Sequence, residues 1–443
     1  MERLTQDDAD LLAIETDVAA VHGLTIGVFE GPEPAFDDLR DHVALRIPLV
    51  PRLRQRLIDV PFDLARPLWV DDPHFSLDFH LRHTALPERR EDDALAALVS
   101  RLMSQRLDRG KPLWELWMVS GLKDNHWALL SKVHYAMIDG VSGTDVFGLL
   151  LDDAAVPETT DDFRPRPLPT NSSLIPSALL ESMLNPIEQA RNVQSFATAP
   201  LRLGRKAIEN ATSSSRPRGF RATLGPHRRW QRMQLPLAET RKVRDRHDCT
   251  TTDVILAGIT GGIRHYLLEL GERVPRQLST LIPLAVATEA TGFAHGVTTL
   301  RALLPVGTDD PVARLDTISA QTRLRARSEG AVGSESLRRQ HQFSSPTVMA
   351  GGMRATFLDS SSLRNVDTVT INIPGPGETQ TVMGSELLKA YPVIPLAGRV
   401  RMAVAVLSYR DDLSFGVTGD WDSTPELHKL TEGIRIAITD LLD

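Results

Sequence analysis

A seven-residue segment, HYAMIDG (134–140), carries side chains suited to acid–base chemistry. Its imidazole, His134, has an ordinary pKa of about 6.5 and can accept or donate a proton near neutral pH. Its phenol, Tyr135, has an ordinary pKa of about 10, so it is a poor base under the same conditions. Asp139 and Gly140 end the segment with a carboxylate and a residue that permits a tight turn. We therefore expect the active site in this segment.

Two regular elements are expected to hold the segment in place. Residues 126–133 form a short apolar run that is typical of a buried strand. Residues 142–152 predict a helix, because Ser142 can cap it and apolar residues follow at helical spacing. A polar loop between a rigid strand and a helix is a common way to hold a reactive group steady.

Composition excludes several classes of function. The chain has 443 residues, 42% hydrophobic and 24% charged, which is typical of a globular protein with two domains. A net charge of −7 argues against nucleic acid as a partner. The single cysteine, Cys249, leaves no disulfide or thiolate cluster, and we expect no metal site. No apolar run approaches the roughly 18 residues of a membrane span and no signal peptide is visible, so we expect a cytoplasmic protein.

The sequence divides into three ranges. Residues 1–155 alternate predicted strands and helices around the 134–140 segment and are expected to form one α/β unit. Residues 156–232 are basic and interrupted by prolines, which favours a solvated connector. An anionic-membrane contact and a site for the phosphates of a nucleotide-like cofactor are the alternatives for this range. Residues 233–443 are expected to form a second α/β unit, so the fold class is α/β, or α+β.

Hydrophobic periodicity predicts further elements in both units. In the first unit they are a strand (24–29), a helix (36–47), an extended segment (68–81) and a helix (92–107). In the second unit they are a helix (251–268), two strands (280–286, 366–373), a hairpin (400–407, 413–418) and a final helix (425–441).

A few side chains carry expectations of their own. The glycines of the helix at 251–268 weaken it, so they indicate close packing against another backbone: Gly258, Gly261 and Gly262. His80 and His83 are expected on a surface strand. Trp114 and Trp117 are expected in the core.

Five segments occur in the order of a known family's signature blocks: KPLWELWMVSGL, HYAMIDG, TDVILAGITGGIRHYL, NIPGPG, and LSY with FGVTGD. They resemble, respectively, the PLW block, the HHxxxDG signature, the Asn-Asp helix, the NVPGP block and the C-terminal pattern of the bacterial wax ester synthase/diacylglycerol acyltransferase family. The resemblance runs from about Leu4 to about Leu441, which is nearly the whole chain.

The resemblance implies a fold and an activity. The fold would be two chloramphenicol-acetyltransferase-like domains packed face to face, with a tunnel between them and the HHxxxDG turn midway. The activity would be acyl-CoA-dependent O-acyl transfer to a long-chain alcohol or diacylglycerol, giving wax ester or triacylglycerol. Acyl-CoA would be a co-substrate, and no bound cofactor is implied. Contact with a lipid droplet, or peripheral contact with the inner membrane, would suit such substrates.

The resemblance also implies roles for particular residues. In such enzymes the second histidine is the general base, which takes the alcohol's proton as the oxygen attacks the thioester. Here that position is Tyr135, and His134 falls on the first-histidine position, so either residue could stand at the base position. Asp139 and Gly140 would shape the loop.

Further roles lie in the second unit. Asn372 would polarise or orient the reacting groups, and Thr252 and Asp253 would contribute to substrate binding. Arg301 and Arg401 are both candidates for the partner of Asp139. A catalytically impaired relative that binds acyl lipid or acyl-CoA is the alternative function.

Overall fold

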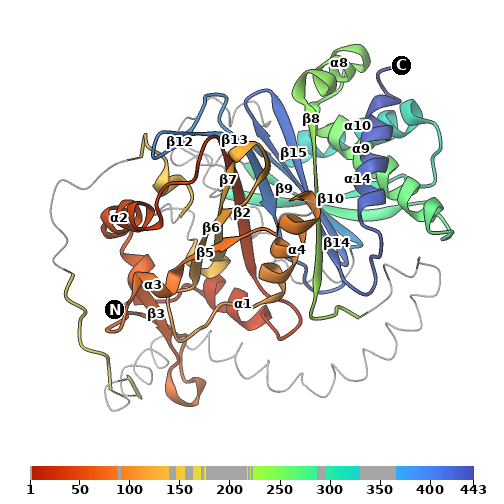
Figure 1. The fold of residues 1–443 in the computed structure, drawn as a ribbon. Helices are drawn as coiled ribbons and strands as arrows, with labels where there is room; N and C mark the ends of the chain where they lie inside the picture. Colours follow the sequence, from red (N-terminus) through yellow and green to blue (C-terminus); the bar gives the residue numbers. More distant parts are fainter. Residues whose placement is uncertain are drawn as a thin grey trace.

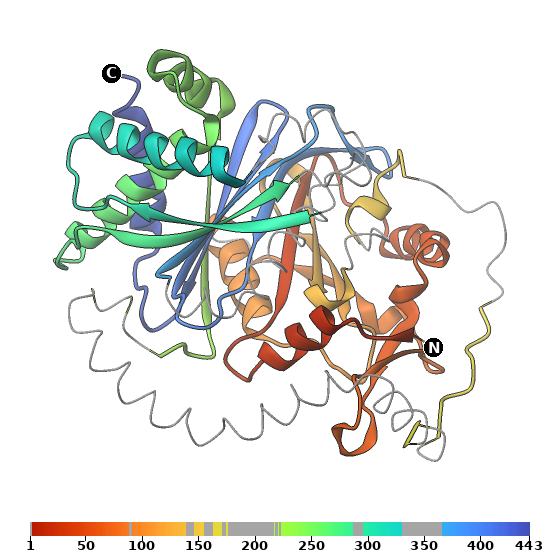
Figure 2. The same cartoon turned by 180° about the vertical axis from the view of Figure 1, so that it is seen from behind.

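The computed structural model describes residues 2–87, 91–138, 146–154, 163–170, 174–175, 217, 220, 223–286, 296–329 and 366–443. Within these ranges, two six-stranded sheets form the body of the molecule, and helices lie against them (Figures 1 and 2). A small three-stranded sheet lies beside the first of them. The mixed α/β fold that the sequence predicts is therefore confirmed.

The first large sheet contains the strand that leads into the 134–140 segment. Its neighbours are antiparallel except β5 and β6, which are parallel. In spatial order its strands are β12 (Thr381–Val382), β13 (Ser385–Val393), β2 (His22–Phe29), β7 (Trp127–His134), β6 (Trp114–Ser120) and β5 (Leu81–Ala85). One face packs on α4 (Glu91–Ser104), and the other contributes Trp127 and Leu129 to the largest core cluster.

The remaining elements of the N-terminal half surround this sheet. The helices are α1 (Gln6–Ile14), α2 (Phe36–Arg46) and α3 (Leu77–His80). The three-stranded sheet consists of β1 (Glu2–Arg3), β4 (Leu68–Asp71) and β3 (Gln55–Ile58). Short 3₁₀ helices are η1 (Ile47–Leu49), η2 (Pro51–Arg54), η3 (Pro61–Asp63) and η4 (Lys123–Asn125).

The second large sheet is formed by residues after 227. It is antiparallel except around β11, which runs parallel to both of its neighbours. In spatial order its strands are β10 (Gly296–Leu304), β9 (Leu278–Val286), β11 (Thr368–Pro374), β14 (Met402–Tyr409), β15 (Asp412–Asp420) and β8 (Arg228–Pro236). The predicted hairpin is β14 and β15, as their antiparallel register confirms.

In the described ranges, the helices that accompany the second sheet are α8 (Leu237–His247), α9 (Thr251–Glu269), α10 (Pro311–Glu329) and α14 (His428–Thr439). Figure 1 shows α9, α10 and α14 together on the side of this sheet that faces away from the first. A Cβ on Gly258 would lie 2.5 Å from Ile438, and one on Gly262 would lie 2.8 Å from the backbone nitrogen of Ile434. The close backbone packing predicted for the glycines of α9 is therefore confirmed, with α14 as the partner.

The two large sheets meet where β13 approaches β15 (Figure 1). A Cβ on Gly416 would lie 1.8 Å from the carbonyl oxygen of Pro392, so the two backbones touch there. β8 adds a second contact, because the N–H groups of Arg228 and Trp230 donate to the hydroxyls of Ser104 and Ser100 on α4, both at 2.9 Å.

The sheets do not follow the three sequence ranges strand by strand. β13 belongs to the range 233–443 yet extends the first sheet, and the limit at residue 232 falls inside β8. The division into 1–155, 156–232 and 233–443 stays a proposal about domains.

Some local predictions are corrected. His80 is not on a surface strand: it ends α3 and is 1% exposed, with Nδ1 2.8 Å from the carbonyl oxygen of Trp114 and its ring stacked on that indole. This contact explains why a polar ring is buried. His83 is half-buried on β5. Trp114 is in the core as predicted, and Trp117 is only partly buried.

Helix boundaries also differ. α14 begins at His428, a few residues later than the capping pattern predicts. The described end of the helix predicted over 142–152 is a turn followed by the 3₁₀ helix η6 (Gly148–Leu150), and residues 142–145 lie outside the described ranges.

Candidate active site

The described part of the motif is the end of β7 and the 3₁₀ turn η5 (Tyr135–Met137). The backbone N–H of His134 donates to Leu113 at 3.0 Å, and that of Tyr135 donates to Val21 at 3.1 Å. Neighbouring residues at a strand end point to opposite faces, so the two rings lie on different sides of the sheet. Asp139 and Gly140 lie outside the described residues, so their roles stay predictions.

The Tyr135 ring is part of the largest core cluster. It is 1% exposed, and a Cβ added to Gly23 would lie 2.6 Å from its hydroxyl oxygen. Because Gly23 on β2 has no side chain, there is room for the phenol. Burial raises the pKa of Tyr135 well above its ordinary value. The hydroxyl therefore remains protonated near neutral pH, where it can donate a hydrogen bond but cannot take up a proton.

His134 lies on the other face of the sheet, in a polar environment. Its Nδ1 accepts a hydrogen bond from the backbone N–H of Ala136 at 3.0 Å, which caps η5. Its Nε2 faces Oε1 of Glu15 at 3.6 Å. An Nδ1 that accepts carries no proton, so the proton of the neutral ring resides on Nε2. Both ring nitrogens therefore face protein groups, and the ring is 1% exposed.

Residues 150–152, further along the chain, are held from two directions. Nε2 of His42 on α2 donates to the carbonyl oxygen of Leu150 at 2.9 Å. The carboxylate of Asp152 accepts the backbone N–H groups of Met383 and Gly384, both at 2.8 Å, at the turn between β12 and β13. These contacts tie residues 150–152 to α2 and to the hairpin that extends the sheet.

Asn372 and Thr252 meet in the second sheet. Asn372 is near the end of β11, and its Nδ2 donates to Oγ1 of Thr252 in the first turn of α9 at 3.1 Å. Its neighbours Ile371 and Ile373 point to the opposite face of β11, into the core cluster that contains Tyr135. The structure thus brings together two of the predicted site residues and places His134 and Tyr135 in a separate group.

Asp253 has a local structural task. Its carboxylate and the side chain of Thr250 form a capping box, with Thr250 N–H donating to Oδ2 at 2.8 Å. The hydroxyl of Thr322 donates to Oδ1 at 2.6 Å. The side chain is fully buried, so these contacts fix the start of α9 and hold the adjacent Thr252 in position.

The candidate partners of Asp139 can be placed only in part. Arg401 is buried and donates to the carbonyl oxygens of Gly398 and Val400, both at 3.1 Å. Arg301 is exposed on β10. Because Asp139 itself is outside the described residues, the choice between them stays a prediction.

Sequence reasoning missed Glu15 and Gly23, which contact the motif from residues more than a hundred positions away. The one local signal for Glu15 is a carboxylate placed between the apolar runs LLAI and VAAV. Burial raises the pKa of Glu15, but His134 and Arg109 lower it by more, to about 2.

The lowered pKa of Glu15 predicts how the free energy of unfolding depends on pH. The pKa of Glu15 in the folded protein is below its ordinary value of 4.5, so its stabilising effect is present above about pH 4.5 and is lost as the pH falls towards 2. Glu15→Gln is expected to reduce the free energy of unfolding by on the order of 2–3 kcal/mol at neutral pH and by progressively less towards about pH 3. Urea unfolding at several pH values measures this. Asp17→Asn removes an exposed carboxylate of the same loop that pairs with Arg106, and as the control it should change the free energy of unfolding by less than about 1 kcal/mol.

The side chains and helices of the described ranges bear on metal binding and on membrane spans. Within those ranges, no group of three or more histidine, cysteine, aspartate or glutamate side chains is arranged to hold a metal ion. No helix in the same ranges combines the length and the apolar character that a membrane span requires.

Comparison with solved structures identifies the fold. The wax ester synthase/diacylglycerol acyltransferase from Marinobacter aquaeolei VT8 matches with a TM-score of 0.69 at 24% identity, covering 99% of this chain and 98% of that one. The starter condensation domain of rhizomide synthetase RzmA in complex with C8-CoA matches with a TM-score of 0.51 at 15% identity, covering 100% and 95%. The chain therefore has the two-domain acyltransferase and condensation-domain fold that the sequence predicts.

Sequence comparison identifies the family. The model of the wax ester synthase/diacylglycerol acyltransferase catalytic domain matches residues 4–255, and that of the C-terminal domain matches residues 296–441. A relative in Mycobacterium tuberculosis, named diacylglycerol O-acyltransferase tgs1, is 34% identical over 454 residues, which cover 100% of this chain and 96% of the relative. The chain belongs to the wax ester synthase/diacylglycerol acyltransferase family.

Proposed function

We propose that this protein is an O-acyltransferase that moves an acyl group from acyl-CoA to the hydroxyl of a long-chain alcohol or diacylglycerol. The observation that carries the proposal is family membership over nearly the whole chain, with a motif turn at the end of the central strand β7. Relatives that cover the whole chain are named diacylglycerol O-acyltransferases. Because these names specify diacylglycerol as the acceptor, diacylglycerol is the first acceptor to test.

Acyl-CoA is the proposed acyl donor. The RzmA condensation domain, which shares the fold, was solved with C8-CoA. We place the thioester and the acceptor in a passage between the two large sheets, beside the 134–140 turn. Substrates of this kind partition into lipid, so a cytoplasmic protein in peripheral contact with the inner membrane or a lipid droplet suits the reaction.

The chemistry is one displacement. The alcohol oxygen attacks the thioester carbonyl, the C–S bond breaks, and the alcohol's proton ends on the CoA thiol. Tyr135 stands at the position that the resemblance assigns to the base, and its raised pKa prevents it from taking that proton at neutral pH. His134 has Nδ1 occupied by Ala136 and Nε2 directed at Glu15. Without a general base, the acceleration comes from positioning the two substrates and from hydrogen bonds to them. Asp139 and Gly140 shape the turn.

The buried phenol of Tyr135 also favours a second function. A buried phenol in place of a base suits a relative that binds acyl-CoA or acyl lipid without transferring the acyl group. Thr252, Asp253 and Asn372 would then contribute to binding alone.

The direct test separates the two functions. Purified protein is incubated with radiolabelled palmitoyl-CoA and either hexadecanol or a diacylglycerol, and labelled ester is measured. The enzyme is expected to form ester above the level of the double variant His134→Ala, Tyr135→Phe. Palmitoyl-CoA binding by calorimetry without any ester above that level would select the binding function, and neither binding nor ester would exclude both.

Asn372 supports a further prediction. Asn372→Ala tests the orienting role that the resemblance implies: a role as donor to a developing oxyanion predicts a kcat lower by roughly 10- to 100-fold, because such a donor acts mainly in the transition state. Thr252→Val removes the hydroxyl that holds the amide and should cost less than about 10-fold. Steady-state kinetics with palmitoyl-CoA measures both. An unchanged kcat in Asn372→Ala, with a lowered melting temperature, would assign Asn372 a purely structural role.

A further inference from the structure

A loop between α1 and β2 connects the motif to both large sheets. The loop contains residues 15–21 and is closed by paired backbone hydrogen bonds between Thr16 and Ala19. Glu15 begins the loop, and its side chain is only 2% exposed although it is a carboxylate. A buried carboxylate is costly unless charged or hydrogen-bonding partners surround it, so its contacts explain its presence.

Three groups surround the Glu15 carboxylate. Arg109 donates from Nε and Nη2 to the same oxygen, Oε2, at 3.1 and 2.9 Å, so two charge-assisted hydrogen bonds hold that oxygen. The backbone N–H of Val21 donates to Oε1 at 3.3 Å. On its remaining side, Oε1 faces Nε2 of His134 at 3.6 Å. The carboxylate is thus held on two sides and presented to the imidazole on the third.

The His134 ring connects Glu15 to the motif turn. Its Nδ1 accepts the N–H of Ala136, and this bond starts η5 and sets the direction of the chain after β7. The bond requires an unprotonated Nδ1 and therefore a proton on Nε2. A carboxylate beside Nε2 favours that tautomer, because it attracts the N–H. Glu15 and Ala136 therefore select the same state of the ring from opposite sides.

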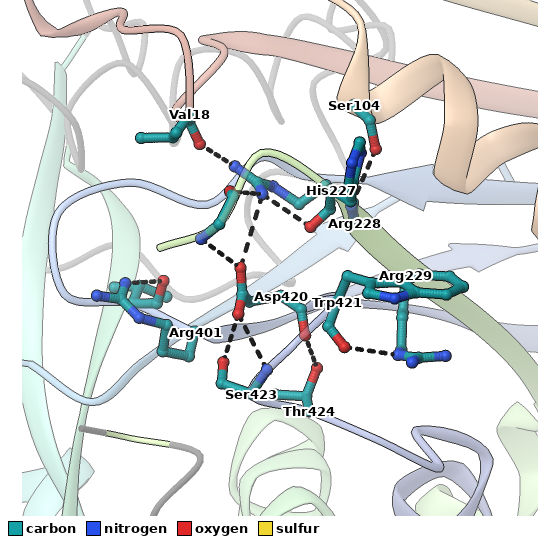
Figure 3. A network of polar contacts seen from close by, with 12 residues as sticks. Val18, Ser104, His227, Arg228, Arg229, Arg401, Asp420, Trp421, Ser423 and Thr424 are labelled. Atoms are coloured by element: carbon teal, nitrogen blue, oxygen red, sulfur yellow. Dashed lines mark hydrogen bonds and ion pairs between the residues drawn. The ribbon is translucent and has the colours of Figure 1, made fainter. Parts of the chain in front are cut away.

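The loop is also fixed from the second sheet (Figure 3). Arg228 on β8 donates from Nη2 to the carbonyl oxygen of Val18 and from Nη1 to those of Gly225 and His227. Its Nη1 lies 3.9 Å from Oδ1 of Asp420, and both side chains are almost fully buried. Asp420 in turn accepts from the backbone N–H of Gly225 and from Ser423.

We propose that Glu15 is a positioning residue for the motif: it holds His134 in the Nε2–H tautomer and so fixes the η5 turn, and Arg228 holds the loop that carries Glu15. The role in catalysis rests on the proposed acyltransferase function, whereas the tautomer does not. Through this loop, the position of β8 in the second sheet can affect the turn at the end of β7 in the first sheet.

The test compares Glu15→Gln with Asp17→Asn, the matched loss of an exposed carboxylate in the same loop. Proteins labelled with ¹⁵N-histidine give ring-nitrogen signals, and the pair belonging to His134, among 13 histidines, is found by its loss in His134→Asn. The wild-type protein and Asp17→Asn are expected to show a protonated Nε2 and an unprotonated Nδ1. In Glu15→Gln the two signals should move towards each other as the ring samples both tautomers.

Kinetics provide the second readout. Glu15→Gln is expected to lower kcat by about 10- to 100-fold and to change KM by less than about 2-fold, as a displaced positioning group does. Unchanged ring signals in a folded Glu15→Gln protein would overturn the proposal. A wild-type ring with its proton on Nδ1 would do the same, and this measurement needs no variant to fold. If the wild-type protein transfers no acyl group, the ring signals still decide the role of Glu15, so the two proposals fail separately.

Discussion

Tyr135→His is expected to raise the rate of acyl transfer by roughly 10²- to 10⁴-fold, the usual contribution of a general base. In the wild-type protein, burial raises the pKa of the Tyr135 phenol, so residue 135 cannot take the alcohol's proton. An imidazole has an ordinary pKa close to neutral and is smaller than the phenol, so it fits beside Gly23. The measurement is kcat with palmitoyl-CoA and the better acceptor, from about pH 6 to about pH 9. The new rate should rise with pH as the imidazole loses its proton.

Tyr135→Phe is the matched control for this experiment. It keeps the ring and removes only the hydroxyl, so its rate should stay within a few-fold of the wild-type rate if the phenol is not a base. A folded Tyr135→His protein that is no faster than the wild type would show that base catalysis does not limit the reaction. A large loss of activity in Tyr135→Phe would show that the hydroxyl itself takes part, as a hydrogen-bond donor.

Gly416→Ala is expected to destabilise the protein by at least about 3 kcal/mol, or to prevent it from folding in soluble form. The added Cβ would lie 1.8 Å from the carbonyl oxygen of Pro392 and 3.2 Å from Nε1 of Trp230. Both sheets are built on backbone hydrogen bonds, so neither strand can withdraw without breaking its ladder. The urea midpoint at constant slope measures the loss.

Gly377→Ala provides the matched comparison. A Cβ at Gly377 would meet no atom within 4 Å, so this variant should change the free energy of unfolding by less than about 0.5 kcal/mol. Equal midpoints for the two variants would contradict the close approach of β13 and β15. Reduced acyl transfer in a partly folded Gly416→Ala protein would further indicate that the placement of the two sheets affects the site.

Much of the site could be predicted because it is local. An apolar run followed by HYAMIDG predicts a strand that leads into a turn, and β7 and η5 have that arrangement. Asn372 and Thr252 could be proposed separately from their blocks. Their hydrogen bond could not, because it joins β11 to α9 across 120 residues.

The environment of the motif could not be predicted, because it comes from distant residues. The room for Tyr135 depends on the missing side chain of Gly23, and the orientation of His134 depends on Glu15 and Arg109. His80 shows the same limit. Its polar ring suggests a surface position, yet stacking on Trp114 and a contact with that residue's carbonyl oxygen stabilise it in the interior.

By itself, the sequence determined the mixed α/β class, most of the strands and helices, the family resemblance and the position of the motif. These follow from hydrophobic period, capping residues and turn formers, which act over a few neighbouring residues. The tertiary structure alone decided that β13 crosses to the first sheet, that Gly416 meets Pro392, and that Glu15 faces His134. The physical reason is that burial and approach depend on groups far apart in the chain, and no local pattern records which of them will meet.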